Sequence, residues 1–166
     1  ANLRMAILYH SILDGTDFRG AKLPNAVLIG ARGKGAIFIQ ADLSQIYAPN
    51  VSLERGQFNG ANLESANLVA ANLRKSNFSR ATIAQANLQE ANLQEASFPG
   101  SDFTGVQLDA ADLRQANLRG ANLARALGLT QAQIDSACLD EETRLPADLS
   151  RPEPCGEKTT TKKSKR

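Results

Sequence analysis

A leucine or phenylalanine recurs along most of this sequence at intervals that are always multiples of five residues. The position two residues earlier is small, most often alanine, and the position one residue earlier is usually asparagine or aspartate, so the unit is Ala-Asn/Asp-Leu-x-x. Ala-Asn-Leu stands at residues 1–3 and again at residues 121–123, and the register does not slip between them. A period this regular restricts the chain to a repetitive, elongated fold.

Neither regular secondary structure buries a five-residue pattern. On an α-helix a step of five residues rotates the side chain by about 500°, so successive leucines spread around the cylinder. On a straight strand an odd step alternates between the two faces. A chain that turns a corner every five residues buries the whole pattern, because each short straight segment points its leucine and its alanine inward. The period therefore predicts an all-β coil, that is, a β-helix.

The phenylalanines indicate how many straight segments make one coil. Four repeats in each coil would place rings twenty residues apart above one another on one side, about 4.8 Å apart, where aromatic rings stack favourably. The spacing therefore predicts a four-sided coil, with about six coils in residues 1–124. The phenylalanines that share this spacing are Phe18, Phe38, Phe58, Phe78 and Phe98.

The array resembles the pentapeptide-repeat family, and the resemblance covers residues 1 to about 124. It implies a right-handed quadrilateral β-helix, as in short bacterial members of the family, especially cyanobacterial ones. Gly33 and Ala48 depart from the pattern, because they occupy central positions where a leucine or phenylalanine belongs. We expect looser packing around them, since their missing side-chain volume would leave gaps in the core.

The period stops after Ala124, and residues 125–150 are expected to form a helical cap on the C-terminal end. Thr130, with Gln133 three residues later, matches a capping box and predicts a short helix over about 131–138. The apolar residues expected to face the last coil are Leu129, Ile134, Ala137 and Cys138.

Two further segments follow this helix. Residues 140–146, Asp-Glu-Glu-Thr-Arg-Leu-Pro, resemble the closing segment of short members of the same family. Residues 151–166 contain prolines, three consecutive threonines and a lysine cluster, and from Lys158 onward they carry five bases and no acid. This composition predicts a disordered basic tail.

Composition limits the compartment and the partners. Two cysteines in 166 residues do not make a disulfide framework, and Cys155 lies in the predicted tail, which favours a reducing, cytoplasmic location without determining the compartment. No window approaches the roughly 18 apolar residues of a membrane span, so no integral membrane segment is expected.

The sequence offers no constellation typical of catalysis. His10, the single histidine, lies at an outward position and is expected to face solvent or pack on Tyr9. Two cysteines and one histidine do not supply the ligands of a usual zinc site. Asparagine outnumbers aspartate before the leucines, which indicates amide ladders between coils rather than paired carboxylates. We expect no enzyme activity, no catalytic, metal or cofactor site, no cofactor and no small-molecule substrate.

Sorting the outward residues by a twenty-residue coil distinguishes one side. Exposed apolar residues stacked at strand spacing form a strip, and strips of this kind usually mark contact surfaces. We interpret this strip as an interface with an unknown protein partner or a second copy of the chain. The alternative is that residues preceding Ala1 cover it. The strip consists of Ile7, Tyr9, Val27, Ile29, Tyr47, Pro49 and Val69.

The next side is charged but not strongly basic. A groove that binds nucleic acid needs stacking aromatic residues or a larger excess of positive charge. We therefore interpret this side as a solvated surface and nucleic acid as an unlikely partner. Its bases are Arg32, Lys34, Arg55, Arg74, Lys75 and Arg114, interrupted by Glu54, Glu95 and Asp112.

The sequence favours a non-catalytic scaffold that binds another protein, and two alternatives remain open. The quinolone-resistance branch of the family mimics DNA and binds topoisomerases such as gyrase, but mimicry needs an acidic rod, and residues 1–124 carry eleven bases and ten acids. The other alternative is weak binding of nucleic acid or anionic surfaces through the basic tail.

Overall fold

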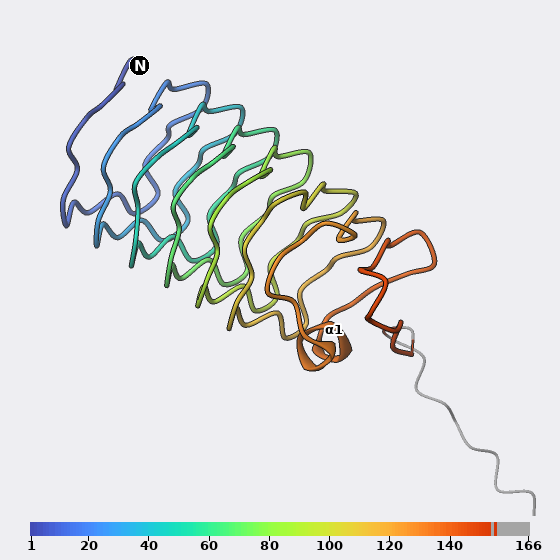
Figure 1. Cartoon of the computed structure of the whole chain (residues 1–166). Coiled ribbons are helices and arrows are strands. Elements are labelled where there is room, and N and C mark those ends of the chain that lie inside the picture. The colour runs from blue at the N-terminus through green and yellow to red at the C-terminus, as the bar shows by residue number, and fades with distance from the viewer. Residues whose placement is uncertain (154, 156–166) are drawn as a thin grey trace, which may run out of the picture.

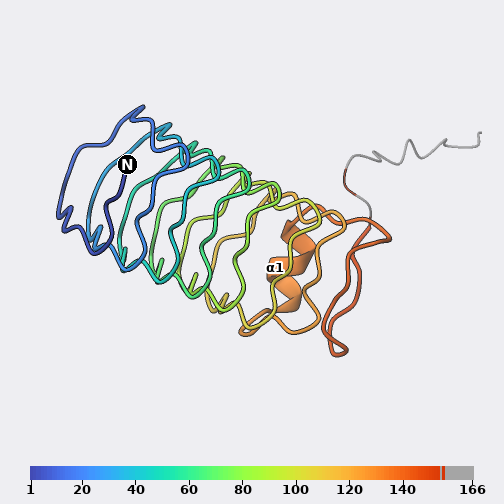
Figure 2. The ribbon, with the colours of Figure 1, turned by 90° about the horizontal axis from the view of Figure 1, so that it is seen from above.

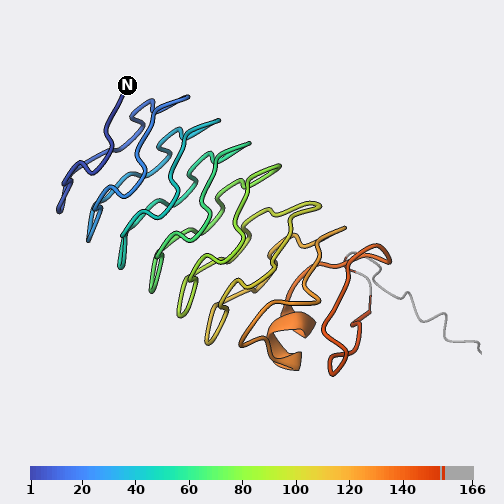
Figure 3. The same cartoon turned by 45° about the horizontal axis from the view of Figure 1, so that its top comes forward.

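The computed structural model describes residues 1–153 and 155. The chain winds into coils that stack along a rod, with the N-terminus at one end (Figure 1). The one helix among the described residues, α1 (Gln131–Ser136), lies at the other end (Figure 2). The turns of successive coils line up along the rod as ridges (Figure 3). The molecule therefore has two ends and a set of long sides.

Parallel β-bridges between residues twenty positions apart join the coils. They are single-residue bridges, not longer strands, and on the first coil they pair Asn2 with Lys22 and Ile7 with Val27. Each bridge has two backbone hydrogen bonds: the Leu3 N–H donates to the Lys22 carbonyl at 2.7 Å, and the Lys22 N–H donates to the Ala1 carbonyl at 3.0 Å. Four five-residue repeats therefore make one coil, with the register that the phenylalanine spacing predicts.

A left-handed residue closes every corner of the repeat body. The fifth residue of each repeat has a positive φ from Met5 (58°) to Gly120 (67°). The turn that contains it is closed by one hydrogen bond, as where the Ala6 N–H donates to the Leu3 carbonyl at 3.0 Å. A positive φ at the third residue of such a turn is the type II geometry, which favours glycine. Most of these corners nevertheless carry other residues, among them His10 and Arg55.

Asparagine and aspartate before the central residue brace these corners. Their side-chain oxygen accepts the backbone N–H two residues later, as between Asn77 and Ser79 at 2.9 Å and between Asp112 and Arg114 at 3.1 Å. The predicted amide ladders are therefore largely wrong. Among the described residues, only two hydrogen bonds join the side chains at these asparagine and aspartate positions between successive coils. The Asn62 amide donates to Asp42, and the Asn122 amide donates to Asp102. The asparagine or aspartate oxygen bonds within its own turn because the backbone N–H two residues later lies within reach of that side chain.

The core is filled by the central leucines and by the alanines two residues earlier. On one side the phenylalanines replace leucine and stack in parallel, with ring centroids 5.0, 5.1, 4.6 and 4.6 Å apart from Phe18 to Phe98. Phe103, five residues after Phe98 and therefore on the next side of the coil, packs edge-on to Phe98 with ring centroids 5.3 Å apart. The stacked rings are shielded from solvent over most of this column, because no more than 1% of the surface is exposed in Phe38, Phe58, Phe78 and Phe98.

The expected loose packing at Gly33 is wrong. A Cβ atom at Gly33 would lie 2.9 Å from Leu53 Cδ2 and 3.2 Å from Leu13 Cβ. The leucines of the neighbouring coils therefore already occupy the space that a side chain would take. Ala48, the other departure from the repeat, is completely buried.

The C-terminal end is closed by α1 and the segment that follows it. Thr130 is the N-cap, and its side chain forms a capping box with Gln133. The helix ends at Ser136 and not near residue 138, because Ala137 is extended and Cys138 joins a bridge to Asn117. Gln133 also reaches the coil, where its side-chain amide donates to the carbonyls of Leu108 (2.8 Å) and Ala111 (2.9 Å). Ile134 and Ala137 are buried, and the partly buried Leu129 packs against the same core.

The two cysteines correct the sequence-based expectation. Cys138 and Cys155 form a disulfide with their Cα atoms 5.2 Å apart. Arg151, also assigned to the predicted tail, donates to the carbonyls of Asp140 and Thr143. The tail prediction is therefore wrong at these positions, and its remaining part, residues 154 and 156–166, lies outside the described residues. The argument for a reducing compartment from unpaired cysteines loses its basis.

Removing a ring from the middle of the phenylalanine column tests its contribution. Phe78→Ala should lower the free energy of unfolding by about 3–5 kcal/mol, because it opens a cavity between two stacked rings. Phe78→Leu should cost about 1.5 kcal/mol or less, since it keeps most of the volume. Urea unfolding measures both, and Phe18→Ala at the partly exposed end of the column serves as a control with a smaller effect. A cost below about 1 kcal/mol for Phe78→Ala would contradict this role.

Gln133→Glu separates the two roles of Gln133. A glutamate keeps the acceptor of the capping box but cannot donate to the Leu108 and Ala111 carbonyls, so it should destabilise the chain by about 1–3 kcal/mol. Thr130→Ala, which removes only the N-cap side chain, should cost about 1 kcal/mol. Thermal and urea unfolding give the comparison, and a Gln133→Glu variant as stable as the original chain would show that the contact with the coil contributes nothing.

Candidate interaction surface

The apolar strip predicted from the sequence runs along one side of the rod, here called face two (residues 6–10, 26–30, 46–50, 66–70 and their successors). Its first column is continuous, because bridges join Ile7 to Val27 and Val27 to Tyr47. Ile7 is 69% exposed, Tyr9 54% and Tyr47 48%. The other members of the face-two strip, all partly exposed, are Val27, Ile29, Pro49 and Val69. The structure thus places the seven predicted residues on one side of neighbouring coils.

Two exposed residues beside the strip were missed. Met5 (69% exposed) precedes face two and Ile12 (79% exposed) follows it, so both lie on the first coil next to Ile7 and Tyr9. They fall on the adjacent sides when the sequence is sorted face by face, which hides their proximity. The sequence did contain a signal for both residues, because each is an apolar residue at an outward position of the repeat. Exposed apolar surface therefore extends around the first coil.

His10 lies at the edge of the strip and packs on backbone. It is exposed, and its imidazole lies over Gly30 of the next coil, where a Cβ atom would come within 2.6 Å of Nδ1. The expected contact was with solvent or Tyr9, and the structure adds Gly30 as the surface beneath the ring. The absence of a side chain at Gly30 is what admits the imidazole.

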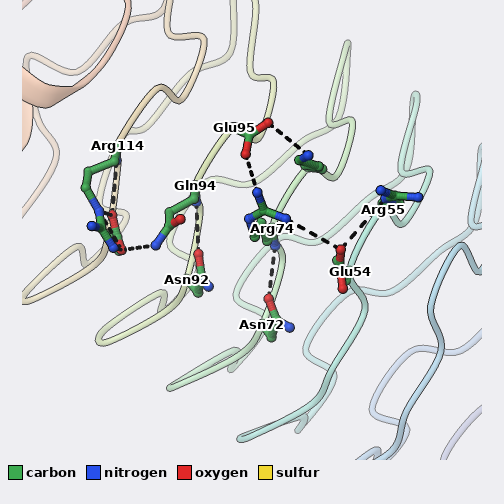
Figure 4. Close-up of polar contacts among 10 residues, drawn as sticks. Glu54, Arg55, Asn72, Arg74, Asn92, Gln94, Glu95 and Arg114 are labelled. Atoms are coloured by element: carbon green, nitrogen blue, oxygen red, sulfur yellow. Dashed lines mark hydrogen bonds and ion pairs between the residues drawn. The ribbon is translucent and has the colours of Figure 1, made fainter.

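The charged side, face three (residues 11–15, 31–35, 51–55 and their successors), forms ion pairs between coils. Arg74 contacts Glu54 at 3.7 Å and also contacts Glu95, whose other oxygen lies 3.2 Å from Lys75 (Figure 4). Arg55 also pairs with Glu54, at 3.7 Å. The bases in the middle of this face are therefore matched by carboxylates.

A second charged group on this face surrounds Asp112. Arg114 lies 2.6 Å from this carboxylate, and the Gln94 side chain donates to it at 2.5 Å (Figure 4). The hydrogen bond from Arg114 is the main cause that lowers the pKa of Asp112 from 3.8 to about 2, against the effect of burial. Burial is the largest influence on Glu95 and raises its pKa, but Lys75 and Arg74 together outweigh it, so the pKa is lowered. Both carboxylates are ionised at neutral pH.

The described residues contain neither a metal-binding cluster nor a membrane-spanning helix. In residues 1–153 and 155, no group of three or more histidine, cysteine, aspartate or glutamate side chains is arranged to hold a metal ion. Over the same residues, no helix is long and apolar enough to cross a membrane.

Stacked four-sided coils with an apolar core and outward variation define a β-solenoid repeat protein. The family model described as pentapeptide repeats matches in 8 copies, at residues 11–46, 56–92, 86–125 and 102–141. The chain belongs to the pentapeptide repeat family, whose members fold as right-handed quadrilateral β-helices. No curated protein matches the sequence.

Solved structures of the same family are similar at low identity. A pentapeptide repeat protein from the thylakoid lumen of Arabidopsis thaliana is 21% identical over 75% of this chain and 72% of that chain, with a TM-score of 0.53. QnrB1, a plasmid-mediated fluoroquinolone resistance protein, is 22% identical over 88% and 78%, with a TM-score of 0.42. HetL, involved in heterocyst differentiation regulation in the cyanobacterium Nostoc, is 24% identical over 90% and 70%, with a TM-score of 0.32. At these identities the first similarity supports the fold alone.

The Asp112 cluster gives a prediction for pH. Because the folded pKa is lowered, ionised Asp112 stabilises the folded chain above about pH 3.8, and this contribution is lost as the pH falls toward about 2. Arg114→Ala should move the pKa of Asp112 back toward 3.8, as followed by NMR of the side-chain carboxyl carbon. Arg74→Ala, which removes a base that contacts the other cluster, should leave Asp112 unchanged. An Asp112 that already titrates near 3.8 in the original chain would refute the assignment.

Proposed function

We propose that this protein is a non-catalytic scaffold that binds another protein chain through the face-two strip and the adjoining apolar surface of the first coil. The observation that carries this proposal is the clustering of exposed apolar side chains there. Of the six large apolar residues that are prominently exposed within residues 1–153 and 155, five lie in the first three coils: Met5, Ile7, Tyr9, Ile12 and Tyr47. Clustered exposure of this kind is unusual unless the surface meets a partner.

The repeat architecture suits such a role. We take residues 1–124 as about six coils and residues 125–150 as their cap, which gives a rigid rod whose sides are long and flat. With about 4.8 Å between coils, the four coils that carry the strip span about 15 Å. Its two tyrosines, Tyr9 and Tyr47, belong to a residue type that is enriched in protein interfaces. Pentapeptide repeat proteins are generally scaffolds and not enzymes.

The charges favour a protein partner over nucleic acid. The seven residues of the face-two strip carry no charge, so desolvating them costs little. The bases at the centre of face three are already engaged with Glu54 and Glu95. DNA mimicry has no comparable support, since residues 1–124 carry eleven bases against ten acids. Binding through the basic residues from Lys158 onward concerns residues outside those described.

Charge substitution within the strip tests the proposal. Tyr47→Glu should abolish binding, because it buries a carboxylate in an apolar interface. Gln57→Glu is the matched control: it introduces the same charge at another exposed bridge position, on a different side of the rod. Light scattering over a range of protein concentrations measures self-association, and quantitative affinity capture measures binding of other chains.

The result that supports the proposal is a loss of self-association, or of a specific captured protein, in Tyr47→Glu but not in Gln57→Glu. Circular dichroism establishes that both variants keep the fold. If the two variants and the original chain show the same association state and the same captured proteins, the face-two strip is not an interaction surface.

A further inference from the structure

The disulfide joins two segments that are held in different ways. Cys138 is part of the β-ladder: its N–H donates to the Ala116 carbonyl and its carbonyl accepts from Leu118, both at 2.8 Å. Cys155 lies at the end of a short segment, residues 151–153 and 155, here called the C-terminal strap. The described residues of the strap form no backbone-to-backbone hydrogen bond with the rest of the described chain. One cysteine is therefore fixed by the fold, and the other depends on the bond between them.

The remaining contacts of the strap are few and made mostly by side chains. Arg151 donates to the carbonyls of Asp140 and Thr143, the latter at 2.7 Å. The Arg119 guanidinium donates to the Cys155 carbonyl at 3.5 Å, which is a long and therefore weak hydrogen bond. Arg151 itself is exposed, so water competes for its donors. The disulfide is the one covalent cross-link among the contacts of the strap.

The strap covers part of the closed end of the rod. Pro152 and Cys155 contribute the strap's part of the wall of a hollow that Arg119 and the buried Leu139 also line. Both cysteines are partly exposed, so an incoming thiol can approach the sulfur atoms. Opening the bond would free this wall while Cys138 stays in the ladder.

We propose that the Cys138–Cys155 disulfide is a redox modification site, at which a dithiol reductant releases the C-terminal strap from the last coil. The dithiol's first thiolate attacks one sulfur, forming a mixed disulfide and expelling the other cysteine as a thiolate that takes up a proton. The dithiol's second thiolate then attacks its own sulfur in the mixed disulfide and expels the second cysteine. The protein gains two thiols, and the reductant becomes a cyclic disulfide. Reoxidation by an oxidised dithiol restores the bond by the reverse steps.

Backbone dynamics of the full chain test this release. In the oxidised protein, 15N NMR order parameters for Arg151 and Cys155 should be about 0.85, and after addition of dithiothreitol they should fall below about 0.6. Residues 41–100 of the repeat body should not change. Alkylation of the unfolded chain counts the thiols, with none expected before reduction and two after it, because no described cysteine is free. The proposal is overturned if free thiols are already present, if the strap stays rigid after reduction, or if the repeats loosen equally.

Two variants separate the disulfide from the other contacts. Cys155→Ser should show the mobile strap without reductant and no response to dithiothreitol. Arg151→Ala removes the side-chain anchor but keeps the disulfide, so its strap should stay ordered until dithiothreitol is added. A mobile strap in oxidised Arg151→Ala would show that the guanidinium, and not the disulfide, holds the segment, and would overturn the proposal.

Discussion

A hydrogen-bonded corner with a left-handed residue recurs every five residues, and the rest of the rod depends on it. The corner turns the chain through one side of the square and returns each leucine and alanine to the interior. It costs backbone strain wherever the residue is not glycine, as at Arg55 (φ 59°) and Lys75 (φ 60°). At both corners the turn hydrogen bond and a backbone hydrogen bond to the neighbouring coil hold the residue in place, and at Lys75 the Asn72 oxygen adds a third contact to the same turn.

Once the corners are formed, the interior leaves little freedom. Beyond the first coil, the central leucines and phenylalanines and the alanines two residues before them are almost completely buried, and even Gly33 is enclosed by Leu13 and Leu53. A core this uniform serves every coil in the same way, so it cannot distinguish one part of the rod from another. Differences appear only outside, where face two is apolar in the first coils and face three is occupied by ion pairs. A specific role for this protein must therefore lie in its surface and its ends.

The sequence predicted those features whose physical cause repeats along the chain. The phenylalanine spacing predicted four sides, because rings at equal heights on one side must be separated by one coil length. The capping box at Thr130 and Gln133 was readable for a similar reason, since its two contacts are local. The contact of Gln133 with Leu108 and Ala111 was not readable, because it joins the helix to a coil more than twenty residues earlier.

The sequence by itself determined the coil, its register and the composition of each side, because a five-residue period leaves one way to bury its apolar positions. Only the tertiary structure decided what happens where the period ends or is interrupted. The pairing of Cys138 with Cys155 and the filling of space at Gly33 each depend on how separate segments meet in space. No periodic signal encodes these contacts, since each is made only once along the rod.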